Sequence, residues 1–202
     1  MTDNSKGWAD PGAAGSMALS IAVFGFFAVL TGRVEGSGII LLSMWLLAGF
    51  VVHIIVAIVK LLSGNTVDGN AFIFFASFLM LAAALDFMIK WMAMQNGWTI
   101  DTRMSGYLWI PLWLTTWLWT PAIWRTSPLV FNIAIFFMDI AFPFVCLTNL
   151  QVLAPAYASI AGYCLLLTGI LTLWLGTAGM VNAAFGRNIL PVGEPILKDK
   201  TI

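Results

Sequence analysis

Four ionisable residues lie inside long apolar stretches of the sequence: His53, Asp86, Lys90 and Asp139. A charge at the centre of a bilayer costs about 2.5–3.5 kcal/mol on insertion scales, so such residues usually face a partner or a water-filled cavity. The chemistry open to them is ion pairing, proton transfer or the guidance of a charged solute.

Asp86 and Lys90 are four residues apart, which places them side by side on a helix. They can form a mutually satisfied pair, with Lys90 extending to the outer interface, or they can line the charged vestibule of a pore. Phe75 lies eleven residues before Asp86, about three helical turns, so the two should share a face. If Phe75 lines a pore, Asp86 should face the same lumen.

Asp139 has no charged neighbour at helical spacing, and Asn132 lies on its face seven residues earlier. Asp139 is either a buried, protonated acid that is hydrogen-bonded across helices, or a pore-facing acid that takes and releases protons. His53 either forms a structural hydrogen bond or acts as a titrating relay near physiological pH. A metal site is not expected, because one His and scattered carboxylates offer no ligand spacing.

The composition shows what kind of element must hold these residues. The chain has 202 residues, 61% of them hydrophobic and 9% charged, and a mean hydropathy of +0.96. A soluble chain carries roughly 25% charged residues. The apolar runs are continuous rather than alternating, which indicates membrane helices and not barrel strands. The predicted fold is an all-α membrane protein, a single domain over 1–202 with a polar segment 1–14, a tail 184–202 and six spans at 15–32, 38–62, 70–94, 106–124, 128–149 and 156–183.

Several other classes of protein are disfavoured. The net charge of zero gives no basic footprint for nucleic acid. Cys146 and Cys164 both lie inside predicted spans, where they suit small core side chains and form no disulfide framework or zinc pattern. No cleavable signal peptide is expected. An enzyme is the least favoured class, since no nucleophile–base pair or phosphate loop is apparent, and no cofactor is expected.

Cationic residues near the span ends predict the orientation. The richer side should be cytoplasmic and holds both termini; it carries Lys6, Lys60, Arg125, Arg187, Lys198 and Lys200, against Arg33, Lys90 and Arg103 on the other side.

Glycines and prolines recur in the later predicted spans. Glycines recur every seven residues at Gly162, Gly169 and Gly176, so one face of the last span should pack closely, within a protomer or between protomers. Prolines should kink or unwind their helices, and Pro143, one turn after Asp139, is the best candidate for a broken helix on a solute path.

Tryptophans crowd the fourth span and its approaches, where they suit an interfacial belt better than an aromatic ligand cage.

Three short motifs carry a family resemblance. The first precedes the first span, the second precedes the third span, and the third follows the last span. Their residues are Asp10, Pro11 and Gly15; Gly64, Asn65 and Thr66; and Asn182, Gly186, Arg187, Pro191, Gly193 and Glu194. Together they resemble the signatures of the acetate/succinate permease family, also called the acetate uptake transporters, over nearly the whole chain.

The resemblance implies a six-helix protomer of a ring-shaped homohexamer in the inner or plasma membrane. It implies passage of small carboxylates such as acetate and succinate through a pore in each protomer. Carried over, the pore constriction comprises Leu19, Phe75 and, with about one residue of alignment slack, Asp139. The chain departs from the family pattern at several polar positions: Asp10 replaces Asn, His53 replaces Gln, Lys60 and Gly179 replace Glu, and Asp86 replaces an apolar residue.

Three functions remain open. The first is a channel or transporter for short monocarboxylates, either proton-linked or passive, with Asp86, Lys90, Asn132 and His53 as polar pore, vestibule or supporting residues. Acids along such a pore would repel an anion unless they are protonated or paired, or unless protons accompany the solute. The second is the same fold passing a neutral or cationic solute. The third is a non-transporting membrane scaffold or partner subunit.

Overall fold

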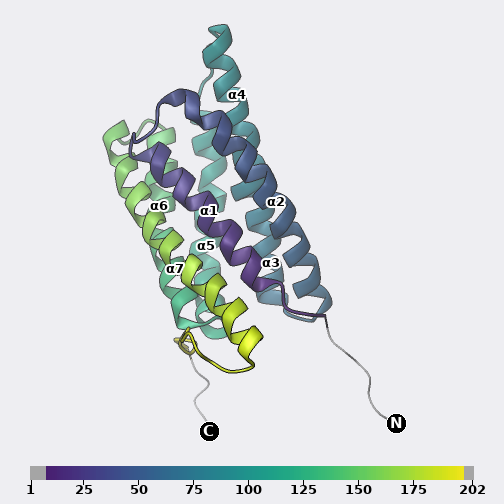
Figure 1. Ribbon diagram of the computed structural model, residues 1–202. Coiled ribbons are helices and arrows are strands. Elements are labelled where there is room, and N and C mark those ends of the chain that lie inside the picture. Colours follow the sequence, from purple (N-terminus) through teal and green to yellow (C-terminus); the bar gives the residue numbers. More distant parts are fainter. Residues whose placement is uncertain (1–7, 198–202) are drawn as a thin grey trace.

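The computed structural model describes residues 8–197, which form one bundle of long helices (Figure 1). Two short 3-10 segments, η1 (Gly36–Gly38) and η3 (Pro155–Tyr157), lead into α2 and α7. The helices, in chain order, are α1 (Gly12–Leu30), α2 (Ile39–Leu62), the continuous unit α3 (Thr66–Phe74), η2 (Phe75–Leu81) and α4 (Ala82–Asn96), then α5 (Arg103–Thr126), α6 (Leu129–Asn149) and α7 (Ala158–Phe185).

Each predicted span coincides with one of these helical units, so the all-α membrane fold is confirmed. Five of them are long and apolar enough to cross a membrane. The exception is α5, which has 24 residues and is therefore long enough, at about 36 Å. It is less apolar because it contains five tryptophans, four threonines and two prolines. The sixth predicted crossing thus rests on the length of α5 and on its packing against α6.

The third helical unit is not a regular α-helix throughout. Its middle segment, η2, is π-helical. A π segment closes i→i+5 hydrogen bonds and so turns less per residue than an α-helix. Residues after η2, Asp86 among them, are therefore rotated from the positions that α-helical counting gives them.

The three heptad-spaced glycines of α7 all pack on α1. A Cβ at Gly162 would lie 2.7 Å from the Thr31 side chain, and a Cβ at Gly169 would lie 2.8 Å from the Phe24 ring. A Cβ at Gly176 meets Met17 and the Ala13 carbonyl in the same way. The close packing predicted for this face is therefore made within the protomer, between its first and last helices.

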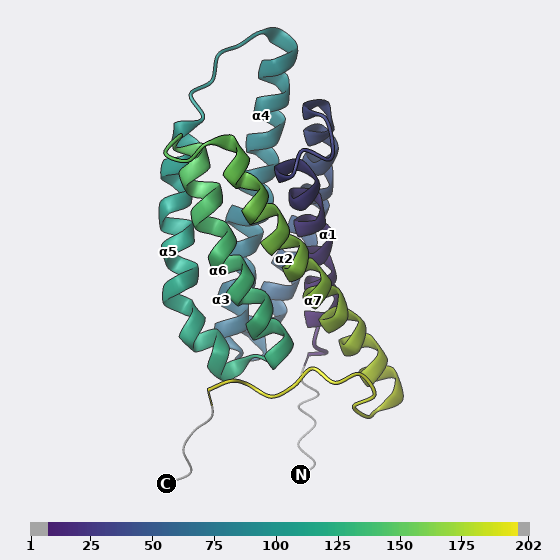
Figure 2. The same ribbon diagram turned by 90° about the vertical axis from the view of Figure 1, so that its left-hand side faces the viewer.

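The described ends of the chain lie at one end of the bundle, which we call the terminal end; α4 projects beyond the other helices at the opposite end (Figures 1 and 2). Lys60, Arg125 and Arg187 follow or end helices at the terminal end. Arg33, Lys90 and Arg103 lie toward the opposite end, as the charge pattern predicts. Lys6, Lys198 and Lys200 lie outside the described residues. So do residues 1–7 of the predicted polar segment 1–14 and residues 198–202 of the predicted tail 184–202.

Candidate functional site

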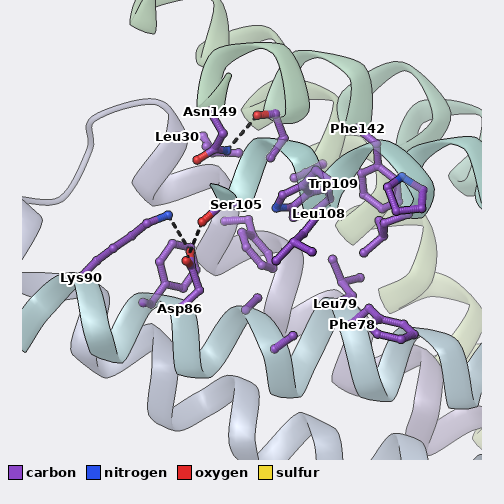
Figure 3. A pocket seen from close by; sticks show the side chains of 18 of the residues that line it. Leu30, Phe78, Leu79, Asp86, Lys90, Ser105, Leu108, Trp109, Phe142 and Asn149 are labelled. Carbon is purple, nitrogen blue, oxygen red and sulfur yellow. Dashed lines mark hydrogen bonds and ion pairs between the residues drawn. The ribbon is translucent and has the colours of Figure 1, made fainter. Parts of the chain in front are cut away.

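A cavity of about 460 Å³ lies inside the bundle, toward the end opposite the termini. Side chains of α1, the α3–η2–α4 unit, α5, α6 and α7 line it, and most of them are aromatic or aliphatic (Figure 3). Phe78 and Leu108 line this cavity although they are 52% and 65% exposed, so it is open on the side between η2–α4 and α5.

Three polar residues of the cavity gather around Asp86, Asp86 itself included, while a fourth, Asn149, donates to the Val145 carbonyl instead. Lys90 Nζ donates to one carboxylate oxygen of Asp86 over 2.6 Å, and the Ser105 hydroxyl donates to the other over 2.8 Å (Figure 3). The three residues come from α4 and from the first turn of α5. Asp86 and Lys90 are therefore an ion pair and line a cavity at once, and their place in the vestibule of a pore stays a prediction.

The loop that joins α4 to α5 adds a second ion pair near this end of the bundle. Arg103 donates to both carboxylate oxygens of Asp101, at 2.6 Å in the shortest contact, and its backbone N–H also donates to Asp101. These hydrogen bonds lower the pKa of Asp101 to about 2. The pair is neutral as a unit, so it adds no net charge beside the cavity.

Beyond the cavity, toward the terminal end, the bundle is filled by a buried apolar cluster. Leu19, Phe75 and Met138 belong to it and are 2%, 4% and 0% exposed. They lie seven, nine and nine residues from the starts of α1, α3 and α6, all at the terminal end, so their depths agree to within about 3 Å. Seven residues of this cluster also line the cavity, and of those on α6 and on the α3–η2–α4 unit Leu79 and Phe142 lie nearest the terminal end, so we call these two the floor of the cavity.

The structure does not bring Asp139 together with Leu19 and Phe75. One residue along an α-helix is a rotation of about 100°, and it is the preceding residue, Met138, that lies in the buried cluster. Asp139 instead turns toward α5. Its carboxylate is hydrogen-bonded to the Thr120 hydroxyl at 2.6 Å.

Asp139 lies beside a second hollow, of about 600 Å³, formed by α5 and α6 alone. Thr120 Oγ1 is also 2.9 Å from the carbonyl oxygen of Thr116. A hydroxyl has one hydrogen, so Thr120 donates either to Asp139 or to that carbonyl. A protonated Asp139 could donate to Thr120, which would then donate to Thr116. The arrangement can therefore hold a proton, but outside the Leu19–Phe75–Met138 cluster.

Pro143 does not break α6, which continues through it. The proline has no N–H to donate to the carbonyl of Asp139, four residues earlier. The indole N–H of Trp117 donates to this carbonyl from α5 over 2.8 Å. The expected gap in the helix is thus closed by a neighbouring helix, and the break predicted on the solute path does not occur.

His53 is fully buried and acts across helices. Its Nε2–H donates to the carbonyl oxygen of Gly15 over 3.0 Å, and its ring meets Phe72 edge-on at 5.3 Å between centroids. A Cβ at Gly15 would lie 2.5 Å from the Phe72 ring. Gly15 therefore gives room for the contact of α1 with α3, and His53 makes the structural hydrogen bond that was one of its two predicted roles. It does not line the cavity.

Asn132 closes the turn between α5 and α6. Its side-chain amide donates to the carbonyls of Trp124 and Ser127, at 3.3 and 3.1 Å. It is fully buried and lines neither hollow. The structure places it in a helix-terminating role rather than with Asp86 and Lys90.

The first two motif regions meet at the terminal end. Gly64 has φ +79° and ends α2 in a Schellman turn, in which the Asn65 N–H donates to the Lys60 carbonyl. The side chain of Asn65 then caps α3 by accepting from the Asp68 N–H. Lys60 forms ion pairs with Asp10 at 2.9 Å and with Asp68 at 3.2 Å. Asp10 and Lys60, which the sequence marks as unusual at their positions, are therefore partners in one ion pair.

The third motif folds into a strap that we define as residues 186–197. Asn182 accepts from the N–H groups of Ile189 and Leu190 at 2.8 and 2.9 Å and donates to the Leu190 carbonyl. Gly186 ends α7 in a left-handed conformation. The strap then crosses beneath the bundle (Figure 2), and the Leu197 N–H donates to the carbonyl of Trp124 in α5. Pro191 and Gly193 contact Trp174 and Leu129 on the way.

Sequence reasoning missed three residues that the structure makes prominent. Ser105 belongs to the polar group of the cavity, Met138 belongs to the buried cluster, and Trp117 replaces the hydrogen bond that Pro143 lacks. Pro143 itself was a signal for the role of Trp117, since the proline leaves the carbonyl of Asp139 without a helical donor. Nothing in the local sequence marks the other two.

No protein-family model and no curated protein matches this chain. Its fold is similar to a solved structure described as that of the bacterial acetate channel SatP, with a TM-score of 0.78 and 20% sequence identity. The match covers 92% of this chain and 99% of the other. The arrangement of helices is therefore similar to that of a protein described as a membrane channel.

Proposed function

We propose that this protein is a membrane channel or transporter for short monocarboxylates of the acetate class, and not an enzyme. One observation carries the proposal: the bundle holds a cavity toward one end, and a buried apolar cluster fills the bundle near mid-depth. A cavity that ends at an apolar constriction is the layout of a gated path, in which passage requires the constriction to open or to become wet. The similar fold of an acetate channel supports the same class of solute.

In this proposal Leu19, Phe75 and Met138 form the constriction, and Asp86 with Lys90 forms the polar part of the vestibule. Asp139 acts as a proton-holding group on α6, next to the constriction rather than inside it. Because its carboxyl is hydrogen-bonded to α5, its protonation can change how α5 and α6 pack. Both termini are cytoplasmic, and the protomers form a homohexameric ring; these two statements rest on the charge pattern and on the family resemblance.

The experiment is uptake of labelled acetate into proteoliposomes, with and without an inward proton gradient. Stimulation by the gradient supports proton-linked transport, and uptake indifferent to it supports a passive channel. Asp139→Asn should change the pH dependence of uptake while assembly is retained, and a Ser127→Ala variant at the end of α5 serves as the control. Unchanged uptake at every pH would remove the proton role of Asp139.

No uptake above empty liposomes, from protein shown to be folded, would refute the proposal. A solute with which acetate fails to compete would then point to a neutral or cationic substrate, which the carboxylate of Asp86 in the cavity would suit. A cavity that passes no solute would favour a scaffold role.

A further inference from the structure

The cavity is much larger than acetate needs. Its volume of about 460 Å³ equals the liquid volume of about fifteen water molecules. Acetate has four non-hydrogen atoms, so it would leave most of the cavity to water or empty. The single methyl group of acetate would contact only a small part of the apolar cavity wall. This wall includes the rings of Phe26, Phe74, Phe78, Phe87, Trp109 and Phe142.

The cavity is also polarised along its length. Lys90, Asp86 and Ser105 lie together on one side in Figure 3, while the aromatic and aliphatic side chains extend away from them toward Leu79 and Phe142. A solute that matches this layout has one polar end and one apolar end. A dicarboxylate does not match it, because its second charged group would lie against the apolar floor at a high desolvation cost.

The polar group can recognise an anion. An ammonium has three N–H donors, and the contact with Asp86 uses one of those on Lys90. Both carboxylate oxygens of Asp86 already accept hydrogen bonds, one from Lys90 and one from Ser105. Asp86 therefore holds the ammonium in position, and further N–H groups of Lys90 can donate to a carboxylate from the solute.

Resting on the proposed function, we propose that the solute of this protein is a monocarboxylate whose apolar chain is several carbons longer than the methyl group of acetate. Its carboxylate is bound by Lys90, and its chain lies against the aromatic wall of the cavity. The opening beside Phe78 and Leu108 gives such a chain room to enter. Each added methylene that is buried should tighten binding about fourfold.

The test is equilibrium exchange of labelled acetate in phosphatidylcholine proteoliposomes at neutral pH without a gradient. Unlabelled acetate, butyrate and hexanoate are added as competitors, and empty liposomes correct for diffusion through the lipid. We expect the half-inhibiting concentration to fall by at least about tenfold from acetate to hexanoate. Hexanamide, which has the same chain without the charge, should compete far more weakly than hexanoate.

Two variants assign the effect to the cavity. Ala82 lines the cavity and is exposed, so Ala82→Phe should fill part of the cavity and weaken hexanoate competition at least about tenfold more than it weakens acetate competition. Lys90→Met should weaken both carboxylates. Leu118→Phe is the matched control, since Leu118 is 78% exposed and does not line the cavity.

Acetate exchange with equal or weaker competition by hexanoate would overturn this inference and leave the proposed function standing. The competition series is measured on the wild-type protein, so this outcome does not depend on whether any variant folds. Strong competition by hexanoate that Ala82→Phe and Leu118→Phe leave equally unchanged would also overturn it, since the longer chain would then bind elsewhere. No exchange at all from folded protein would refute the proposed function itself.

Discussion

The hydrogen bond between Trp117 and the carbonyl of Asp139 exists because residue 143 is a proline. In a regular helix the N–H of residue 143 would donate to that carbonyl, and proline has none. The indole N–H of Trp117 takes its place over 2.8 Å. Trp117→Phe removes the donor and keeps an aromatic ring beside Trp113, whose ring centroid is 5.1 Å away. A carbonyl left without a donor costs about 1–3 kcal/mol.

The magnitude follows from a double-mutant cycle with Pro143→Ala. In the alanine background the N–H of residue 143 can donate to the carbonyl, so Trp117→Phe should cost only its lost packing. Measured interhelical hydrogen bonds in membranes average about 0.6 kcal/mol and reach about 1.7 kcal/mol. This bond satisfies a carbonyl with no helical donor, so we expect a coupling energy of about 1–2 kcal/mol between the two positions.

The assay is equilibrium unfolding of the four proteins in mixed micelles, by titration with a denaturing detergent and helix content as the signal. Trp119→Phe in both backgrounds is the control, because the Trp119 ring packs on Phe74 at 5.2 Å. Trp119→Phe should lower the free energy of unfolding by the same amount in the wild-type and in the Pro143→Ala background. If the Trp117 and Pro143 substitutions are additive within about 0.5 kcal/mol, the carbonyl does not depend on the indole and the reasoning is refuted.

Three further predictions concern stability and the strap. Lys60→Met should destabilise the protein by about 1 kcal/mol, since it leaves two neighbouring carboxylates without their cation; Lys60→Arg should restore most of the loss in thermal unfolding. Gly169→Ala should cost about 1–3 kcal/mol despite the better helix propensity of alanine, because its Cβ would lie 2.8 Å from the Phe24 ring; an unchanged midpoint would contradict the α1–α7 packing. Asn182→Ala should release the strap and speed tryptic cleavage after Arg187 about tenfold, equivalent to losing about 1.4 kcal/mol; an unchanged rate would mean that the strap is held elsewhere.

The helical fold could be predicted from the sequence because it depends on properties that each segment carries alone. Continuous apolar runs must satisfy their backbone groups internally, and in lipid only a helix does so within one segment. The pairing of Asp86 with Lys90 was predictable for the same reason, since a spacing of four residues makes side chains neighbours on any α-helix. The close-packed face of α7 followed from its glycine spacing, although its partner helix did not.

Which face of a helix points inward could not be predicted in this way. In a soluble protein the apolar face marks the core, but here lipid and core are both apolar, so α6 carries little sequence difference between its sides. The one-residue difference between Met138 and Asp139 therefore moved the carboxyl from the expected constriction to the α5 side. Counting along the third helical unit is less exact for a second reason, because the π-helical η2 rotates every residue that follows it.

The sequence by itself determined that this chain crosses a membrane as helices, where those helices lie and which residues pair locally, because each of these depends on interactions a few residues apart. The tertiary structure alone decided that Ser105 joins Asp86 and Lys90, that Trp117 completes the helix at Pro143, and that a large apolar cavity lies beside the ion pair. Each of these depends on the rotation of one helix against another. That rotation is set by the packing of whole side-chain surfaces, which no local pattern in the sequence specifies.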